Sequence, residues 1–418
     1  MISIASNNTE KKKGYKLYLA VLVLIPLNFV TPSDEIGVSI FSLGFIAFGL
    51  LSVSFLLYAI THNSNVIVIK NRVSALLILI LFVSITVAPW SINIQNSVSD
   101  LVRLGYHVSA AIFISTFLST YWDDFGLILI PKIIAITSSI VAVTVITDYF
   151  SLTSFGTLPG REWSHPDRAA GVVAEPNFAA GLLAISLPFF VYFLSVKDQS
   201  LRSRIPHLIG IIMTISAIYF TGSRMGILLV MFFIVGVVII HRDILMKTPL
   251  IVPTLVALPV GLYVLTVFQP TTIQRFTRLI SYLQGGVGDG SIRERIDLII
   301  AGIDMVEKNL LTGVGPGNFI NAIVNYPDFD SVRYSHNTYI DVASQIGIIG
   351  FFSFLLLLTY IFKRLLYIGH NDLSAHYILS YLILLGYLLF LSNFFSTYLW
   401  FVFIPLSITI ENNMGVHR

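Results

Sequence analysis

The chain contains no cysteine among its 418 residues. This absence excludes disulfide bonds and thiolate metal sites, and with them the small folds that depend on either. Charge is also scarce, because only 11% of the residues are Asp, Glu, Lys or Arg, whereas an average soluble domain has about 25%. An ordinary soluble globular protein is therefore excluded.

Apolar residues are what the chain has in excess. They make up 56% of the sequence, and the mean hydropathy is +0.84. A helix that crosses a bilayer needs about 20 mostly apolar residues. The sequence predicts an all-α polytopic membrane protein with about twelve transmembrane helices, at 17–31, 37–60, 73–90, 101–120, 131–149, 176–196, 205–221, 223–240, 249–268, 340–362, 375–391 and 396–411.

The distribution of positive charge predicts the topology. Four lysines between positions 11 and 16 precede the first apolar segment, and no small-residue cleavage motif follows it. With the N-terminus inside, fifteen of the 25 Lys and Arg residues lie on the cytoplasmic side, as the positive-inside rule expects. An even number of helices then returns the C-terminus to the cytoplasm. The modest net charge of +3 follows from this topology, so no nucleic-acid partner is expected.

Two predicted outer loops divide the chain. Residues 1–268 hold the first nine helices and a loop at 151–175, residues 269–339 form a loop domain, and residues 340–418 hold the last three helices. Loops of this length are usually functional. Within the loop domain, isoleucines recur at helical spacing over 291–310, which predicts an amphipathic helix whose apolar stripe packs on the membrane domain.

Arginine dominates the outer side of the predicted topology. Nine of the ten outer cations are Arg, whose planar fork suits phosphate. These arginines either reflect ordinary loop composition or form a site for a phosphorylated substrate.

Arg224 opens a predicted helix, whose N-terminus attracts anions. The alternative is that Arg224 anchors the helix at the membrane surface by snorkelling. Arg293 and Arg295 lie at the N-terminus of the amphipathic helix, where positive charge is unfavourable with respect to the helix dipole. Either nearby carboxylates or a bound anion should offset this unfavourable energy.

A polar pair, His336 and Asn337, opens the apolar segment that starts near 340. Ionisable groups at the edge of the hydrocarbon are usually functional. Histidine titrates near neutrality and can take a proton from a hydroxyl group, although a hydrogen-bonded interfacial histidine is the alternative. Asn337 and Tyr339 are candidates for orienting the imidazole ring or a substrate.

The first outer loop supplies three further candidates, Arg161, Arg168 and Glu175. Glu175 precedes Pro176, which suits a first helical turn, so its carboxylate could lie in the site.

No spacing of His, Asp and Glu resembles a set of metal ligands, and we expect neither a metal nor a cofactor. The glycine-rich segment 313–319 has no following Lys-Ser/Thr and is predicted to form a turn rather than a nucleotide loop.

Three fragments follow one another along the chain: TGSRMGILL, RIDLIIAGIDMVEKNLLTGVGPGNF and HNTYIDVASQIGIIGFF. Together they resemble the signature of the O-antigen ligase and Wzy-type polymerase superfamily, over roughly residues 160–365. The resemblance implies a GT-C-like fold and an inverting, metal-independent glycosyltransferase in the bacterial inner membrane. Ile299, where many relatives have Trp, and Leu310, near a common proline, depart from the pattern.

The resemblance also implies roles for residues. Arg224 and Arg295 would hold the pyrophosphate of an undecaprenyl-linked glycan donor, with Arg293 as a second candidate. His336 would activate a hydroxyl of the acceptor on the periplasmic face. The acceptor is lipid A–core for a ligase, or a growing O-antigen, capsule or exopolysaccharide chain for a polymerase. A chain-length regulator and a flippase are the candidate partner proteins.

A membrane transporter for bicarbonate or another small solute is the alternative from a different class. Such a protein should carry charges or broken helices near the middle of the membrane. The predicted spans are almost free of charge in their centres, and the ionisable residues gather outside. This pattern favours the enzyme.

Overall fold

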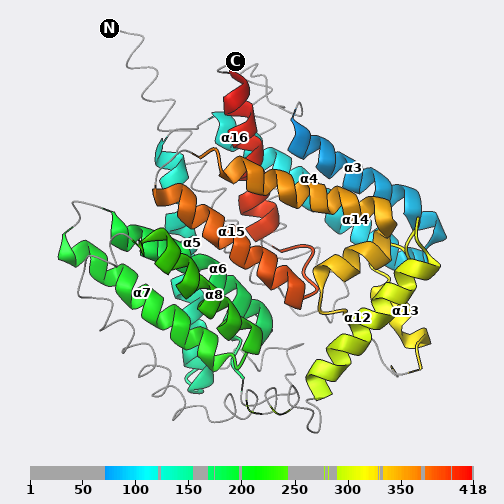
Figure 1. Ribbon diagram of the computed structural model, residues 1–418, viewed down its shortest axis with the longest axis horizontal. Helices are drawn as coiled ribbons and strands as arrows, with labels where there is room; N and C mark the ends of the chain where they lie inside the picture. The colour runs from blue at the N-terminus through cyan, green and yellow to red at the C-terminus, as the bar shows by residue number, and fades with distance from the viewer. Residues whose placement is uncertain are drawn as a thin grey trace.

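The computed structural model describes residues 71–120, 124–153, 168–173, 175–196, 200–242, 277, 281, 290–327, 329, 333–368, 372–396 and 398–416. Within these residues the chain forms eleven α-helices and no β-strand (Figure 1). The prediction of an all-α fold is confirmed for this part of the chain.

Nine long or medium helices build the body of the molecule, joined by short helical turns. They are α3 (Arg72–Val87), α4 (Ile94–Thr120), α5 (Asp124–Tyr149), α6 (Pro176–Ser195), α7 (Leu201–Phe220), α8 (Arg224–Ile240), α14 (Thr338–Leu365), α15 (Asp372–Phe390) and α16 (Ile404–Val416). Outside this body lie α12 (Gly290–Lys308) and α13 (Phe319–Ala322). The short turns are η3 (Ala88–Trp90), η5 (Gly171–Val173), η6 (Ile323–Asn325) and the π-helical η7 (Leu399–Phe403).

The body helices coincide with nine of the twelve predicted transmembrane segments. Six of them, α3, α5, α6, α7, α14 and α15, are long and apolar enough to cross a membrane. Helix α8 and the stretch Leu399–Glu411 are apolar but shorter. Helix α4 is long, but it is not among the candidate spans, and its first half carries Asp100, Arg103 and His107. The predicted segments 17–31, 37–60 and 249–268 lie outside the described residues.

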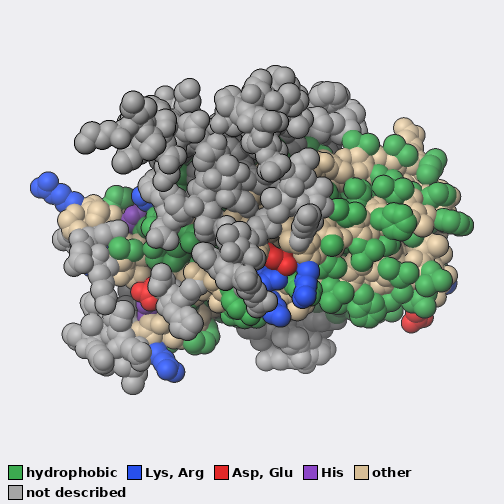
Figure 2. Space-filling view, turned by 90° about the horizontal axis from the view of Figure 1, so that it is seen from above, with side chains coloured by type: hydrophobic (Ala, Val, Ile, Leu, Met, Phe, Trp, Pro, Cys, Tyr) green, Lys and Arg blue, Asp and Glu red, His purple; other side chains and the backbone are tan. Residues whose placement is uncertain are grey.

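The body helices pack in two groups with α15 between them. Helices α5, α6, α7 and α8 pack together, as do α3, α4, α14 and α16, and α15 contacts α6, α8 and α14 (Figure 1). On the right of Figure 2, hydrophobic side chains cover a broad surface. Exposed apolar residues on α3 and α14 include Ile78, Phe82, Ile85, Ile349 and Phe352. A surface of this kind suits contact with lipid.

Several helices begin at a polar side chain that caps the backbone. Asn71, Ser223 and Asn337 each accept a hydrogen bond from an amide of the first turn of α3, α8 and α14. Water is scarce near a bilayer core, so an end without such a cap leaves amides unsatisfied at high cost. The polar residue at each start therefore determines where the apolar helix begins.

Helix α12 confirms the predicted amphipathic helix at 291–310, but it packs with a different face. Ile296 and Ile303 of the predicted stripe stay 42% and 46% exposed. A Cβ atom on Gly302 would lie 2.3 Å from Ile340, so the backbone of α12 approaches α14 more closely than an isoleucine would permit. The prediction that the isoleucine stripe packs on the membrane domain was wrong. The buried face consists of Leu298, Ala301, Gly302 and Met305.

Helix α14 is interrupted at Gly347, whose φ of 68° and ψ of −176° are not helical. The glycine-rich segment fills the interruption: Val314 N donates to Ser344 O over 2.8 Å, and Gly315 N donates to Gln345 O over 3.0 Å. On the other side, Ile348 N donates to Leu310 O over 2.9 Å. The segment is more than the predicted turn, because its amides satisfy the carbonyls that the break leaves open.

Candidate functional site

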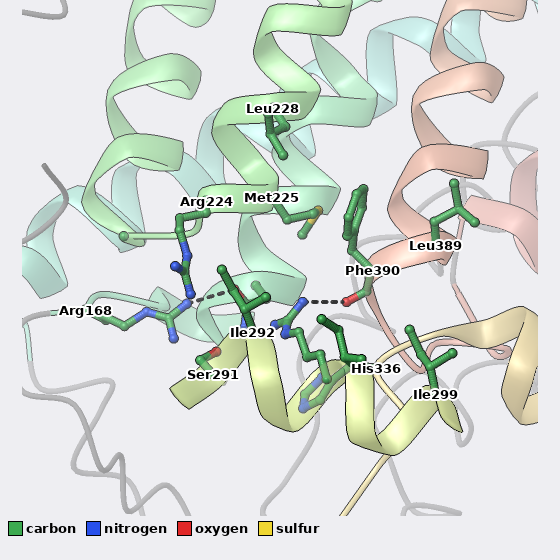
Figure 3. Close-up of a pocket in the computed structure, with 14 residues that line it drawn as sticks. Arg168, Arg224, Met225, Leu228, Ser291, Ile292, Ile299, His336, Leu389 and Phe390 are labelled. Atoms are coloured by element: carbon green, nitrogen blue, oxygen red, sulfur yellow. Dashed lines mark hydrogen bonds between the residues drawn. The ribbon is translucent and has the colours of Figure 1, made fainter. Parts of the chain in front are cut away.

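A cavity of about 350 Å³ lies where one end of the body meets α12 (Figure 3). The starts of α6 and α8, the first turns of α12 and the last residues of α15 line it, together with three residues from the connecting segments. Its polar lining includes Arg168, Asn177, Arg224, Arg295 and His336. Four of the predicted site residues therefore meet at one place, although they are spread over more than 160 positions of the sequence.

Arg168 joins the α7–α8 hairpin to the start of α6. Its Nε donates to Thr221 O over 2.8 Å, and its Nη2 donates to Asn177 Oδ1 over 2.8 Å. Two such bonds hold the plane of a guanidinium in one orientation. The charge of Arg168 is thus fixed at the cavity wall rather than carried on a mobile side chain.

Arg224 is the first residue of α8, and its position depends on the cap before it. Ser223 Oγ accepts from Gly226 N over 3.2 Å and donates to Asn177 Oδ1 over 2.9 Å. Asn177 Oδ1 thereby receives bonds from both Ser223 and Arg168. Figure 3 shows the side chain of Arg224 descending from α8 toward the guanidinium of Arg168. Two guanidinium groups and a helix N-terminus thus concentrate positive charge at this point of the cavity wall.

Glu175 supports this arrangement from behind and does not line the cavity. Its carboxylate caps α6 by accepting from Phe178 N over 2.6 Å, and it also accepts from Asn177 Nδ2 over 2.7 Å. Burial raises the pKa of Glu175, while these hydrogen bonds and the charge of Arg168 act in the opposite direction. The observed role of Glu175 is to hold Asn177.

Arg295 enters the cavity from the second turn of α12. Its Nη1 donates to the carbonyl oxygen of Phe390 over 3.3 Å. Phe390 is the last residue of α15, and a cation interacts favourably with the C-terminal carbonyls of a helix. The dashed line in Figure 3 shows this contact, which brings α12 to the end of α15.

His336 lies in the short segment 333–337 that leads into α14, and Figure 3 shows its ring close to α12. Burial, together with the positive charges of Arg295 and Arg333, lowers the pKa of His336 to about 4, while the charge of Glu294 acts in the opposite direction. The imidazole is therefore neutral near pH 7 and has a lone pair that can accept a proton.

The other predicted residues lie outside the cavity lining. The side chain of Arg293 is 79% exposed and lies 3.9 Å from Asp297. Asn337 caps α14 by accepting from Tyr339 N and Ile340 N. The hydroxyl of Tyr339 donates to Leu385 O over 3.3 Å. Arg161 lies outside the described residues.

Sequence reasoning missed the part that Asn177 plays. An asparagine in the first turn of a helix is ordinary, and no local signal shows that it receives bonds from residues 9 and 46 positions away. The apolar wall of the cavity was missed as well. This wall includes Met225, Leu228, Ile296, Ile299 and Leu389. No group of three or more potential metal ligands occurs among the described residues.

Fold and site together define a polytopic helical membrane protein with an arginine-rich cavity at one end of its helices. Residues 209–355 match the family model described as O-Antigen ligase, Wzy_C, so the chain is similar to this family over this range. The matched residues begin in α7, end in α14 and include Arg224, Arg295 and His336. A comparison with curated proteins gives no match.

Proposed function

We propose that the cavity binds the pyrophosphate of an undecaprenyl-linked glycan, and that the protein transfers the glycan en bloc to a saccharide hydroxyl on the periplasmic face. The observation that carries this proposal is the meeting of Arg168, Arg224, Arg295 and His336 around one cavity. Its apolar wall, which includes Leu228 at 43% exposed and Leu389 at 50% exposed, suits the first units of a prenyl chain.

The reaction needs a stabilised leaving group and one base. His336 takes the proton of the acceptor hydroxyl, and the resulting oxygen attacks the anomeric carbon of the donor. The bond from that carbon to the pyrophosphate breaks, and the arginines stabilise the negative charge that develops on the departing undecaprenyl pyrophosphate. A single displacement inverts the configuration at the anomeric carbon.

A base whose pKa is about 4 is weak in the empty cavity. Part of that depression comes from Arg295 and Arg333. A bound pyrophosphate offsets these positive charges, so donor binding raises the pKa of His336 toward the range in which it can accept a proton. The donor thereby activates the base that the reaction requires.

The transporter alternative has one feature in its favour, the interruption of α14 at Gly347. Broken helices in transporters present open carbonyls to an ion. Here the carbonyls of Ser344 and Gln345 already accept hydrogen bonds from Val314 N and Gly315 N. The interruption therefore does not supply an ion site from these carbonyls, and the enzyme remains the better-supported function.

The test is complementation of a strain that lacks the gene. His336→Ala and Arg224→Ala should each abolish glycan transfer while the protein still inserts into the membrane, and Arg224→Lys should also impair it, because a point charge cannot grip pyrophosphate with two parallel bonds. Normal lipopolysaccharide or polysaccharide profiles in both alanine variants would overturn the proposal. In the deletion strain, lost polymer length indicates a polymerase, and lost attachment indicates a ligase.

A further inference from the structure

The backbone of His336 adopts a conformation that non-glycine residues rarely take. Its φ is 53°, and among the described non-glycine residues only Ser151 also has a positive φ. A side chain in the left-handed region is strained, and such a residue persists only where its surroundings hold it there. The contacts on either side of His336 should therefore show what holds it.

Ser335 bridges the backbone across His336. Its hydroxyl oxygen accepts from Asn337 N over 3.0 Å, and the hydroxyl lies 2.8 Å from Asn337 O, to which it donates. Ser335 is completely buried, so no water competes for these bonds. Both polar groups of residue 337 are thereby tied to residue 335, which forces the chain between them into a tight turn.

Asp341 holds the other side of the turn. It lies in the first turn of α14, is 6% exposed, and its carboxylate interacts with the side chains of Ser392 and Ser335 and with the backbone of Ser335. The hydroxyl oxygens of Ser335 and Ser392 lie 3.1 Å apart. A carboxylate is a strong acceptor, so Asp341 ties the residue before His336 to the first turn of α14.

The same turn is attached to the segment that follows α15. Thr338 Oγ1 donates to Leu391 O over 2.5 Å and accepts from Asn393 N over 2.9 Å. This segment continues from Phe390, whose carbonyl accepts from Arg295. The backbone around His336 and the carbonyl that receives Arg295 are therefore parts of one bonded frame.

We propose that Ser335 and Asp341 are positioning residues for His336. They hold its backbone in the left-handed conformation that directs the imidazole into the cavity, and neither lines the cavity itself. This inference rests on the proposed function of His336 as the base. If Ser335 and Asp341 only stabilised the start of α14, their loss would lower stability without a selective effect on turnover.

The experiment uses the full-length purified protein and separates turnover from donor binding. Turnover is the release of undecaprenyl pyrophosphate from its glycan-linked form, and binding is measured with undecaprenyl pyrophosphate alone. Ser335→Ala should lower kcat by roughly tenfold to a hundredfold, the range expected for a misplaced catalytic group, with binding changed by less than about twofold. The control is Ser344→Ala, because Ser344 is equally buried in α14 and its hydroxyl donates to Ile340 O and Asp341 O of its own helix.

The outcomes separate this inference from the proposed function. A wild-type kcat in Ser335→Ala, or equal losses of binding and turnover, would overturn the positioning role. If Ser335→Ala does not fold, Asp341→Asn keeps the side-chain volume and should lower kcat by about tenfold with binding unchanged; a full kcat there would also overturn it. Wild-type turnover in His336→Ala would instead overturn the proposed function.

Discussion

Asn177 Oδ1 lies 2.8 Å from Arg168 Nη2 and accepts a hydrogen bond from it. The same oxygen accepts from Ser223, the residue that caps α8 before Arg224. One amide oxygen thus sets the positions of two arginines that come from different parts of the chain. The amide nitrogen faces Glu175 instead, so the orientation of Asn177 is determined by its neighbours on both sides.

Replacing Asn177 by Asp tests this relationship. The new carboxylate would pair with the guanidinium of Arg168 and face the carboxylate of Glu175, so the cavity would lose positive charge. We expect binding of undecaprenyl pyrophosphate to weaken by roughly tenfold, equivalent to about 1.4 kcal/mol. Asn325→Asp places the same charge at an exposed position outside the cavity lining and should leave binding unchanged. Equal affinities in the two variants would show that Asn177 does not set the charge of the cavity.

Arg295 and Arg293 should differ sharply when each is replaced by alanine. Arg295 lines the cavity, so its loss should lower turnover by roughly 10²- to 10³-fold, as the removal of one charge-stabilising donor does. The side chain of Arg293 is 79% exposed and lies 3.9 Å from Asp297 in the same helix. Its loss should change turnover by less than about threefold, because exposed ion pairs contribute little. A larger defect in Arg293→Ala than in Arg295→Ala would reverse the assignment.

The pH dependence of kcat/KM should report the charges around His336. The imidazole must be neutral to act as a base, so activity should fall as the pH drops through its pKa, which is about 4 in the free enzyme. Glu294 raises this pKa and Arg333 lowers it. The acid limb should therefore move to lower pH in Glu294→Gln and to higher pH in Arg333→Gln. The two residues form an ion pair of 2.8 Å, and neither lines the cavity, so shifts in the same direction would contradict the assignment.

The absence of native cysteine makes the topology directly testable. Leu311 follows α12 and is 63% exposed, whereas Tyr367 follows the far end of α14 and is 53% exposed. In intact cells, a membrane-impermeant maleimide should label Leu311→Cys and leave Tyr367→Cys unlabelled until the membrane is opened. The opposite pattern would place the cavity on the cytoplasmic side, and the proposed periplasmic reaction would be wrong.

Gly347 should not tolerate a side chain. Its φ is 68°, and an added Cβ would lie 2.3 Å from the carbonyl oxygen of Leu311. Gly347→Ala should destabilise the protein by about 1–3 kcal/mol. Gly105 lies inside α4 with no atom within 4 Å of an added Cβ, so Gly105→Ala should be stabilising by about 0.5–1 kcal/mol. The midpoints of thermal unfolding in detergent check both, and equal midpoints would show that the break in α14 is not strained.

The helices were predictable because hydropathy is a local property of the sequence. Predicted segments at 176–196 and 223–240 correspond closely to α6 at Pro176–Ser195 and α8 at Arg224–Ile240. The interruption of α14 was not predicted. Its cause is contact with the backbone at Leu310, Val314 and Gly315, and no pattern within the helix itself reveals a partner that precedes it by more than thirty residues.

The packing face of α12 shows a related limit. A stripe of isoleucines at helical spacing indicates an amphipathic helix, but it does not say which side meets a neighbour. The close approach to Ile340 needs Gly302 and small side chains, so the face with less hydrophobic surface is the one that packs. The close contact between the backbone of α12 at Gly302 and the side chain of Ile340 decided this, and the most apolar stripe was left at the border of the cavity and at the surface.

The sequence by itself determined that this is a helical membrane protein, because long apolar runs and scarce charge have few other stable structures. It also named the arginines and the histidine as candidates for the site. Only the tertiary structure decided which of them meet. Arg293 and Arg295 are two residues apart, which on a helix turns their side chains about 200° from each other, and Arg168 reaches the cavity through Asn177. Such meetings depend on how distant helices pack, which no local pattern records.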